Sequence, residues 1–382
     1  MPCRTIQIAG VVAATLLLGA PAAAAPPGVR DRQLDVPSHT RTWAIRYRAH
    51  DGRVRVAYVL LPRWYGPRAH PRIPLVISPH GRGVSGLANT TLWGDLPAIG
   101  GFAVVNPDGE GAVLGAYSWG APGQVDDLAR MPAIVHRALP WLRIDRARIY
   151  AFGGSMGGQE TLLLIARHPQ LLAGAAAFDP VVDFAHQYRR YGRLACNAQC
   201  RGQLGASVGA VLRRLARTEV GGDPATARHA YAVRSPVTYA RAIADACVPL
   251  QLWWSRRDRI VVDPESQSGR LLHETRRLNP AAPIVGIEGM WVHSAEMRPH
   301  SRLPFALALF GLLSERFAGV WGFAGASVKP PPDLVCARGA RTRRVAVFRG
   351  VISAAETAGG SARRSVSGDA QLRHRADQKE QT

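Results

Sequence analysis

The sequence predicts an α/β protein with a mostly parallel central sheet, helices on both faces of that sheet and an N-terminal antiparallel hairpin. Short apolar runs alternate with helical patterns over residues 73–178, as is typical of a parallel sheet covered by helices. Before this region, β-type runs at residues 42–48 and 54–61 flank Asp51-Gly52. This pair favours a tight hairpin turn because it tolerates positive φ angles.

The other strands and helices can be followed along the chain. Continuous apolar runs, typical of strands buried on both faces, lie at residues 73–78, 102–106, 148–152, 171–178, 248–254 and 284–287. Helical periodicity predicts helices at residues 92–99, 123–142, 208–215, 265–278 and 303–317. Pro132 can kink or divide the helix expected at 123–142.

The N-terminal residues have the composition of an export signal. Arg4 precedes an apolar stretch from Ile6 to Leu18, and the small residues Ala22–Ala25 offer a cleavage site. Because the apolar stretch is short and Pro21 interrupts it, we do not expect a stable membrane span. We predict that residues 1–25 are a signal peptide and that the mature protein is secreted.

The 382 residues could form one large α/β domain or two of ordinary size. We predict a single domain at residues 40–325, because the sheet pattern that residues 181–235 interrupt resumes after them. We interpret residues 181–235 as a lid-like insertion over the mouth of the sheet. Residues 326–382 are rich in proline at first and then basic, and we expect this tail to be disordered.

The formal net charge of +21 raises the question of nucleic-acid binding. Only Lys329 and Lys379 are lysines, and the arginines are scattered along the chain rather than gathered on one stripe. We therefore expect no nucleic-acid partner.

Five cysteines are present, and Cys3 would leave with the signal peptide. The remaining even number suggests disulfides in an exported chain, with three possible connectivities. We favour the pairs Cys196–Cys200 and Cys247–Cys336; free thiols are the alternative. Since no C-x₂-C pair or nearby histidine couple is present, we expect no bound metal.

A strand, a G-x-S-x-G turn and a helical pattern follow one another at residues 148–169, which is the layout of a nucleophile elbow. The glycines around Ser155 permit a turn too tight for Cβ atoms, and they leave its hydroxyl free. Ser155 is therefore the candidate nucleophile. An unreactive serine on a glycine-rich turn is the alternative.

A nucleophilic serine needs a base, and His293 is the candidate. It follows the strand expected at 284–287, and reactive groups in open α/β sheets gather beyond the carboxyl ends of the strands. His168 and His273 fall at the end and in the middle of predicted helices, where solvent exposure is the simpler explanation.

Asp258 is the candidate acid, because it follows the strand expected at 248–254 and lies between the serine and the histidine. Asp263 is the rival, but it directly precedes a predicted helix, where Asp is a natural N-cap. Three arginines flank Asp258 and could hold it ionised or mark it as a surface ion-pair residue: Arg256, Arg257 and Arg259.

The loop His80-Gly81-Arg82-Gly83 follows an earlier buried strand, where a second oxyanion donor is expected. We predict that the backbone N–H groups of Arg82 and Met156 form the oxyanion hole, with Gly83 as an alternative to Arg82. His80 is expected to have a structural role.

The order HGRG, GGSMGG, RRDRIV and WVHS resembles the α/β-hydrolase fold. In particular, it is similar to the catalytic domain of the prolyl oligopeptidase (S9-like) and secreted esterase/depolymerase group, over residues 40–317. The resemblance implies a triad of Ser155, Asp258 and His293. Two features differ from that group: no long N-terminal propeller precedes the domain, and the loop reads HGRG instead of HGGG.

These observations predict a secreted serine hydrolase that acts through an acyl-enzyme and needs no cofactor. We expect carboxylic esters as its substrates; an S9-like peptidase acting on short peptides is the alternative. A catalytically inactive binding protein on the same fold is the alternative of another class. Activity should fall as His293 becomes protonated, at about pH 6 to 7 for an ordinary imidazole.

Overall fold

A computed structural model of the protein describes residues 30–34, 39–110, 117–194, 208–314, 327–329 and 336. Its strands are β1 Arg30–Leu34, β2 Thr40–Arg48, β3 Val54–Pro62, β4 Ile73–Ile77, β5 Ala103–Pro107, β6 Ile144–Gly154, β7 Gly174–Phe178, β8 Leu250–Ser255, β9 Ile284–Gly289 and β10 Ser327–Lys329. They form one sheet in the order β1-β2-β3-β5-β4-β6-β7-β8-β9-β10. From β5 to β9 in this order, every neighbouring pair is parallel.

The two edges of the sheet are antiparallel. β1, β2 and β3 pair antiparallel with one another in sequence, β3 pairs antiparallel with β5, and β10 pairs antiparallel with β9. The predicted mostly parallel sheet with an N-terminal antiparallel hairpin is therefore confirmed. β1 and β10 were not predicted, and β10 lies inside the segment that was expected to be a disordered tail.

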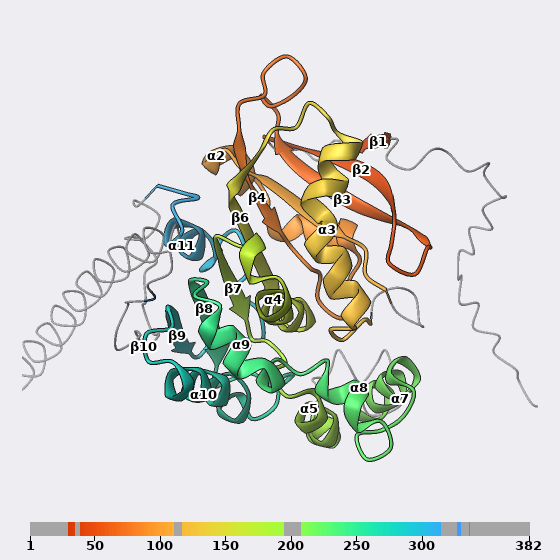
Figure 1. Ribbon diagram of the computed structural model, residues 1–382, viewed down its shortest axis with the longest axis vertical. Coiled ribbons are helices and arrows are strands. Elements are labelled where there is room, and N and C mark those ends of the chain that lie inside the picture. Colours follow the sequence, from red (N-terminus) through yellow and green to blue (C-terminus); the bar gives the residue numbers. More distant parts are fainter. Residues whose placement is uncertain are drawn as a thin grey trace, which may run out of the picture.

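The α-helices of the described residues are α1 Gly86–Asn89, α2 Leu96–Gly100, α3 Pro122–Ala138, α4 Met156–Arg167, α5 Phe184–Arg190, α7 Val208–Val220, α8 Arg228–Ala232, α9 Ala240–Asp245, α10 Arg270–Leu278 and α11 Leu303–Ala308. Helices α3, α4, α9 and α10 share one apolar core with one face of the sheet. Helices α2 and α11 share a second core with the other face. Figure 1 shows α3 and α4 lying across the sheet. Alternate side chains of each central strand thus enter two separate cores.

Several helix boundaries differ from the predictions for local reasons. The helix expected at 92–99 is divided, because Gly94 adopts a φ of 47° between a short 3₁₀ turn and α2. Glu265–Gly269 forms a π-helical turn before α10, and α11 ends at Ala308. Pro132 lies inside α3, which continues through it as a single helix.

Helices α5, α7 and α8 belong to the predicted insertion and gather together beside the sheet (Figure 1). Their apolar residues form a third cluster that also includes Trp119, Met156 and Val261. The described helices of the insertion therefore pack on Met156, the residue that follows Ser155.

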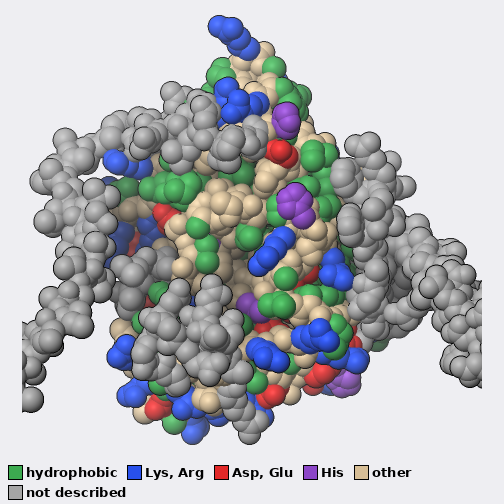
Figure 2. Space-filling model, turned by 180° about the vertical axis from the view of Figure 1, so that it is seen from behind, with side chains coloured by type: hydrophobic (Ala, Val, Ile, Leu, Met, Phe, Trp, Pro, Cys, Tyr) green, Lys and Arg blue, Asp and Glu red, His purple; other side chains and the backbone are tan. Residues whose placement is uncertain are grey.

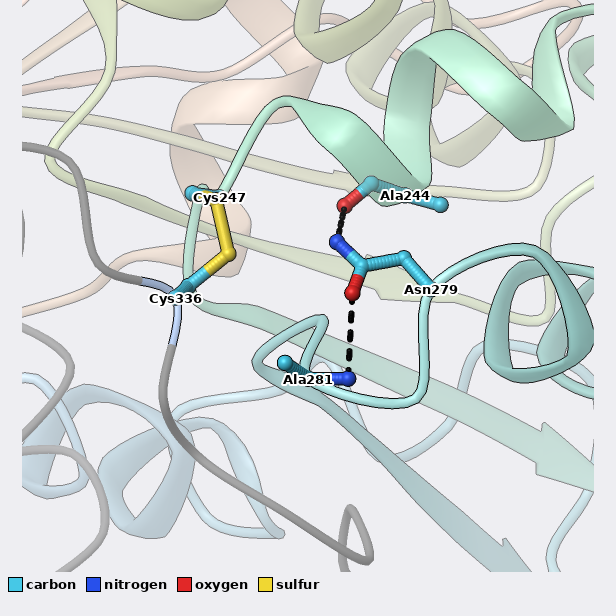
Figure 3. The surroundings of a disulfide bond; sticks show 5 residues. All are labelled: Ala244, Cys247, Asn279, Ala281 and Cys336. Atoms are coloured by element: carbon cyan, nitrogen blue, oxygen red, sulfur yellow. Dashed lines mark hydrogen bonds between the residues drawn. A yellow bond between two sulfur atoms is a disulfide. The ribbon is translucent and has the colours of Figure 1, made fainter.

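A disulfide joins Cys247, which follows α9, to Cys336 (Figure 3). Beside it, Asn279 Nδ2 donates to the Ala244 carbonyl at 3.0 Å, and the Ala281 N–H donates to Asn279 Oδ1 at 3.1 Å. The predicted Cys247–Cys336 pair is thus present. Cys196 and Cys200, like the predicted signal peptide, lie outside the described residues.

The surface carries mixed charges on the face seen in Figure 2, where Lys and Arg side chains are scattered among acidic and apolar ones. Among the helices that the structure describes, none combines the length and apolar character needed to cross a bilayer.

Candidate active site

Ser155 occupies the sharp turn between β6 and α4, with φ 57° and ψ −120°. Residues with a side chain rarely adopt such a conformation, and surrounding contacts must hold it. The Ser155 N–H donates to the Phe178 carbonyl at 2.8 Å, and the Gln159 N–H donates to the Ser155 carbonyl at 3.0 Å. The strained turn is therefore fixed from β7 and from within α4.

The glycines of this turn are needed for close packing. A Cβ atom at Gly153 would lie 2.3 Å from the Gly157 carbonyl oxygen, and one at Gly157 would lie 2.3 Å from the Pro79 carbonyl oxygen. No real Cβ tolerates such distances. The turn consequently lies directly against the loop that begins at Pro79.

That loop is anchored by His80, which is buried. The Gly109 N–H donates to His80 Nε2 at 2.9 Å, so the ring proton is on Nδ1, which donates to the Gly81 carbonyl at 2.9 Å. Burial lowers the pKa of His80, which keeps the ring neutral. His80 thus has the structural role that was expected.

Met156 starts α4, and its side chain is held from the segment before α3. The Trp119 N–H donates to Met156 Sδ at 3.3 Å. Ser118 Oγ lies 3.7 Å from the same sulfur and donates a short hydrogen bond to the buried Glu160. Burial raises the pKa of Glu160 to about 8, so this carboxyl is protonated at neutral pH.

The two amides predicted to form the oxyanion hole belong to Arg82 and Met156. Neither donates a hydrogen bond to any other described residue. The Met156 amide lies in the first turn of α4, where free N–H groups and the helix dipole favour a negative charge.

Asp258 and His293 are brought together from the loops after β8 and β9. His293 Nδ1 lies 2.7 Å from Asp258 Oδ2. Asp258 Oδ1 accepts from the N–H groups of Ile260 at 2.7 Å and Val261 at 3.0 Å. Because both oxygens have partners, the buried carboxylate is held in one orientation.

The arginines beside Asp258 were considered as ion-pair partners that keep it charged or as signs of a surface position. The structure gives them other surroundings. Arg256 pairs instead with the buried Glu288 of β9, and Arg257 and Arg259 are exposed. The rival acid, Asp263, pairs with Arg190 at 2.7 Å and with His186 at 3.3 Å. Asp263 therefore connects the β8 loop to the insertion, and its side chain does not cap the following helix.

Burial and three charged groups determine the protonation of His293. Burial lowers its pKa, but the charge and hydrogen bond of Asp258 and the charge of Asp179 raise it, while Arg82 opposes them. The net result is a pKa above the ordinary value of 6.5. Only 16% of the side chain is exposed to solvent.

The His293 loop also lies against the elbow. A Cβ atom added at Gly154 would lie 3.1 Å from Ser294 Oγ and 3.3 Å from Met297 Sδ. The residue before Ser155 thus faces the residue after His293. The fold brings together the three loops that carry the predicted nucleophile, base and acid.

Asp179 is a buried residue of this site that was not predicted. Its Oδ1 accepts from the Ser255 N–H at 2.8 Å, and its Oδ2 accepts from the Ser294 N–H at 2.7 Å. Asp179, Asp258 and His293 each have a polar atom within 4.8 Å of one another. The oxygens of both aspartates and Nδ1 of His293 take part in hydrogen bonds within this network. The sequence feature that could have indicated Asp179 is its position directly after β7.

No protein-family model matches the chain. Among solved structures, the chain is similar to an acylaminoacyl peptidase of Pyrococcus horikoshii, with 16% identity and a TM-score of 0.50 over 70% of this chain and 40% of that one. It is also similar to an esterase of the archaeon Pyrobaculum calidifontis, with 19% identity and a TM-score of 0.50 over 68% of this chain and 79% of that one. The chain thus spans less than half of the peptidase. The sheet order, the strained serine turn and these similarities identify the chain as a protein with the α/β-hydrolase fold.

Proposed function

We propose that this protein is a serine hydrolase that cleaves carboxylic esters through an acyl-enzyme. The observation that supports this most directly is the 2.7 Å contact between His293 Nδ1 and Asp258, on a loop that packs against the strained Ser155 turn. Ser155 attacks the ester carbonyl while His293 Nε2 takes its proton. The alcohol leaves with that proton, and a water activated by His293 then releases the acid.

Asp258 orients the base in this mechanism. As the acceptor for the Nδ1–H of His293, it selects the tautomer whose Nε2 is free to accept a proton. The Ile260 and Val261 N–H groups, which donate to the other oxygen of Asp258, hold the carboxylate in this orientation. The amides of Arg82 and Met156 stabilise the tetrahedral oxyanion, and each such donor contributes roughly 3 kcal/mol.

Esters are the favoured substrates for two reasons. The chain aligns with 79% of an esterase but only 40% of a peptidase of the same fold. In addition, Met290 and Val292 lie just before His293 in the same loop, with 50% and 72% of their surfaces exposed. Apolar side chains at this position suit the acyl or alcohol part of an apolar ester.

The first test compares Ser155→Ala with Ser266→Ala on a nitrophenyl ester. Ser266 is exposed and lies outside the site, so this matched variant should retain full activity. Ser155→Ala should lose essentially all turnover. Retained hydrolysis in Ser155→Ala would refute the proposed nucleophile.

The second test measures acyl nitrophenyl esters and aminoacyl-p-nitroanilides side by side. We expect turnover of the esters and little cleavage of the anilides. Preferential cleavage of the anilides would instead support the peptidase alternative.

We also propose that the mature protein acts outside the cell after loss of residues 1–25. The Cys247–Cys336 disulfide is consistent with an oxidising compartment. Sequencing the N-terminus of the protein from cells and from medium tests this; an uncleaved protein confined to the cells would contradict it.

A further inference from the structure

A single buried carboxylate connects the two loops that carry the proposed acid and base. Asp179 accepts hydrogen bonds from Ser255, three residues before Asp258, and from Ser294, directly after His293. Both oxygens are used, one for each loop. Displacing this carboxylate would remove the two hydrogen bonds by which Asp179 holds both loops.

The backbone of Asp179 is held in an uncommon conformation, which aims its side chain between the loops. Its φ is 42°, and its N–H donates to the Trp253 carbonyl at 2.9 Å. Residues with side chains adopt this region at a cost, and they persist there when surrounding contacts require it. Asparagine tolerates the same region, so it can replace Asp179 without a change of backbone.

The fully buried Glu296 interacts electrostatically with both Asp179 and Asp258. Burial, and then the negative charge of Asp179, raise the pKa of Glu296 well above its ordinary value. These effects favour the neutral form of Glu296. Burial and the charge of Asp258 raise the pKa of Asp179 to about 6, so Asp179 is the member of this carboxyl pair that carries the negative charge at neutral pH.

We propose that Asp179 is a positioning residue for His293, holding the acid and base loops in register and adding its negative charge to that of Asp258. The charged and titratable groups around His293 are Asp258 after β8, Asp179 after β7 and Arg82 in the loop after β4. Glu296 interacts in turn with Asp179. This inference rests on the proposed hydrolase function.

The test is Asp179→Asn, assayed with the nitrophenyl ester across pH. An asparagine amide has one acceptor oxygen and one donor NH₂, so it can accept from only one of the two backbone N–H groups of Ser255 and Ser294. One loop then loses its hydrogen bond and His293 is less well placed, so kcat should fall by about 10- to 100-fold, with little change in KM. Removing the negative charge destabilises the protonated imidazole, so the acid limb of kcat/KM should move to lower pH. Glu296→Gln is the matched control: burial favours the uncharged form of this acid, the amide has the same shape without a charge, and the acid limb should stay in place.

The outcomes separate this inference from the function on which it rests. An inactive wild-type protein would refute the proposed function. With an active wild-type protein, Asp179→Asn with unchanged kcat, or with reduced kcat but an unmoved acid limb, would overturn the positioning role. If Asp179→Asn does not fold, Asp179→Gly replaces it, because glycine adopts positive φ freely, and the same losses are expected. Added formate should then partly restore turnover to Asp179→Gly, and no restoration would count against the inference.

Discussion

At the scale of single residues, His293 combines burial with two neighbouring carboxylates. Burial favours the neutral ring, whereas Asp258 and Asp179 favour the protonated ring and outweigh burial. The ring is therefore a stronger base than a free imidazole, which suits proton transfer from a serine hydroxyl.

This balance predicts the pH dependence of ester hydrolysis. The proposed base must be neutral, and its pKa in the folded protein lies above 6.5. Activity is therefore lost as the pH falls through that raised pKa, and the midpoint of the acid limb of kcat/KM should lie above pH 6.5. Initial rates at low substrate concentration from pH 4 to 9 measure it. A profile that stays flat down to about pH 4 would exclude a histidine base.

The residues of the site differ in how visible they are in the sequence. Ser155, Asp258 and His293 each follow a predicted strand and stand in the expected order, so they could be proposed from the sequence. Asp179 also follows a strand, but its role depends on hydrogen bonds to Ser255 and Ser294, 76 and 115 residues away. Contacts over such separations leave no local pattern. For the same reason, the pairing of Arg256 with Glu288 could not be foreseen.

At the scale of elements, the serine turn depends on close packing between β6, α4 and the loop after β4. Gly157 is the point of contact, because a Cβ atom there would overlap the Pro79 carbonyl. The same loop carries the Arg82 amide. Packing and the proposed oxyanion hole are thus coupled at this glycine.

Gly157→Ala should therefore reduce both stability and activity. The overlap is with backbone, which cannot move as a side chain can, so we expect a loss of roughly 1 to 3 kcal/mol of unfolding free energy and a lower Tm. Hydrolysis should also fall as the 80–83 loop is pushed away. Gly66→Ala is the matched control, since a Cβ atom at Gly66 meets nothing within 4 Å. Equal Tm and activity in the two variants would contradict this coupling.

The strands were more predictable than the helices. Strands buried on both faces read as continuous apolar runs, and β4, β5 and β8 were predicted to within two residues at each end. Helix boundaries depend on single backbone angles, such as the φ of 47° at Gly94, and on a π-helical turn at Glu265–Gly269. The edge strands β1 and β10 are short, and their pairing partners rather than their own composition define them.

At the scale of the whole molecule, the Cys247–Cys336 disulfide joins residues 89 positions apart. It ties Cys336 to the residues just before β8. A cross-link over such a separation stabilises mainly by restricting the unfolded chain, typically by about 2 to 4 kcal/mol.

Reduction should therefore lower the Tm. A Cys196→Ser, Cys200→Ser variant leaves Cys247 and Cys336 as the remaining cysteines of the mature protein, which isolates this bond. Adding reductant should lower its Tm by several degrees, and Cys336→Ser in the same background should show the low Tm with or without reductant. A Tm insensitive to reductant would show that the bond does not stabilise the domain.

A fluorophosphonate probe reacts with activated serine nucleophiles, so labelling shows whether Ser155 is one. The proposed function predicts rapid, stoichiometric labelling that mass spectrometry places on the peptide containing Ser155, and no labelling of Ser155→Ala. Labelling should slow as the pH falls and His293 becomes protonated. A folded wild-type protein that does not label, or that labels at another residue, would contradict the claim and favour a non-catalytic binding protein.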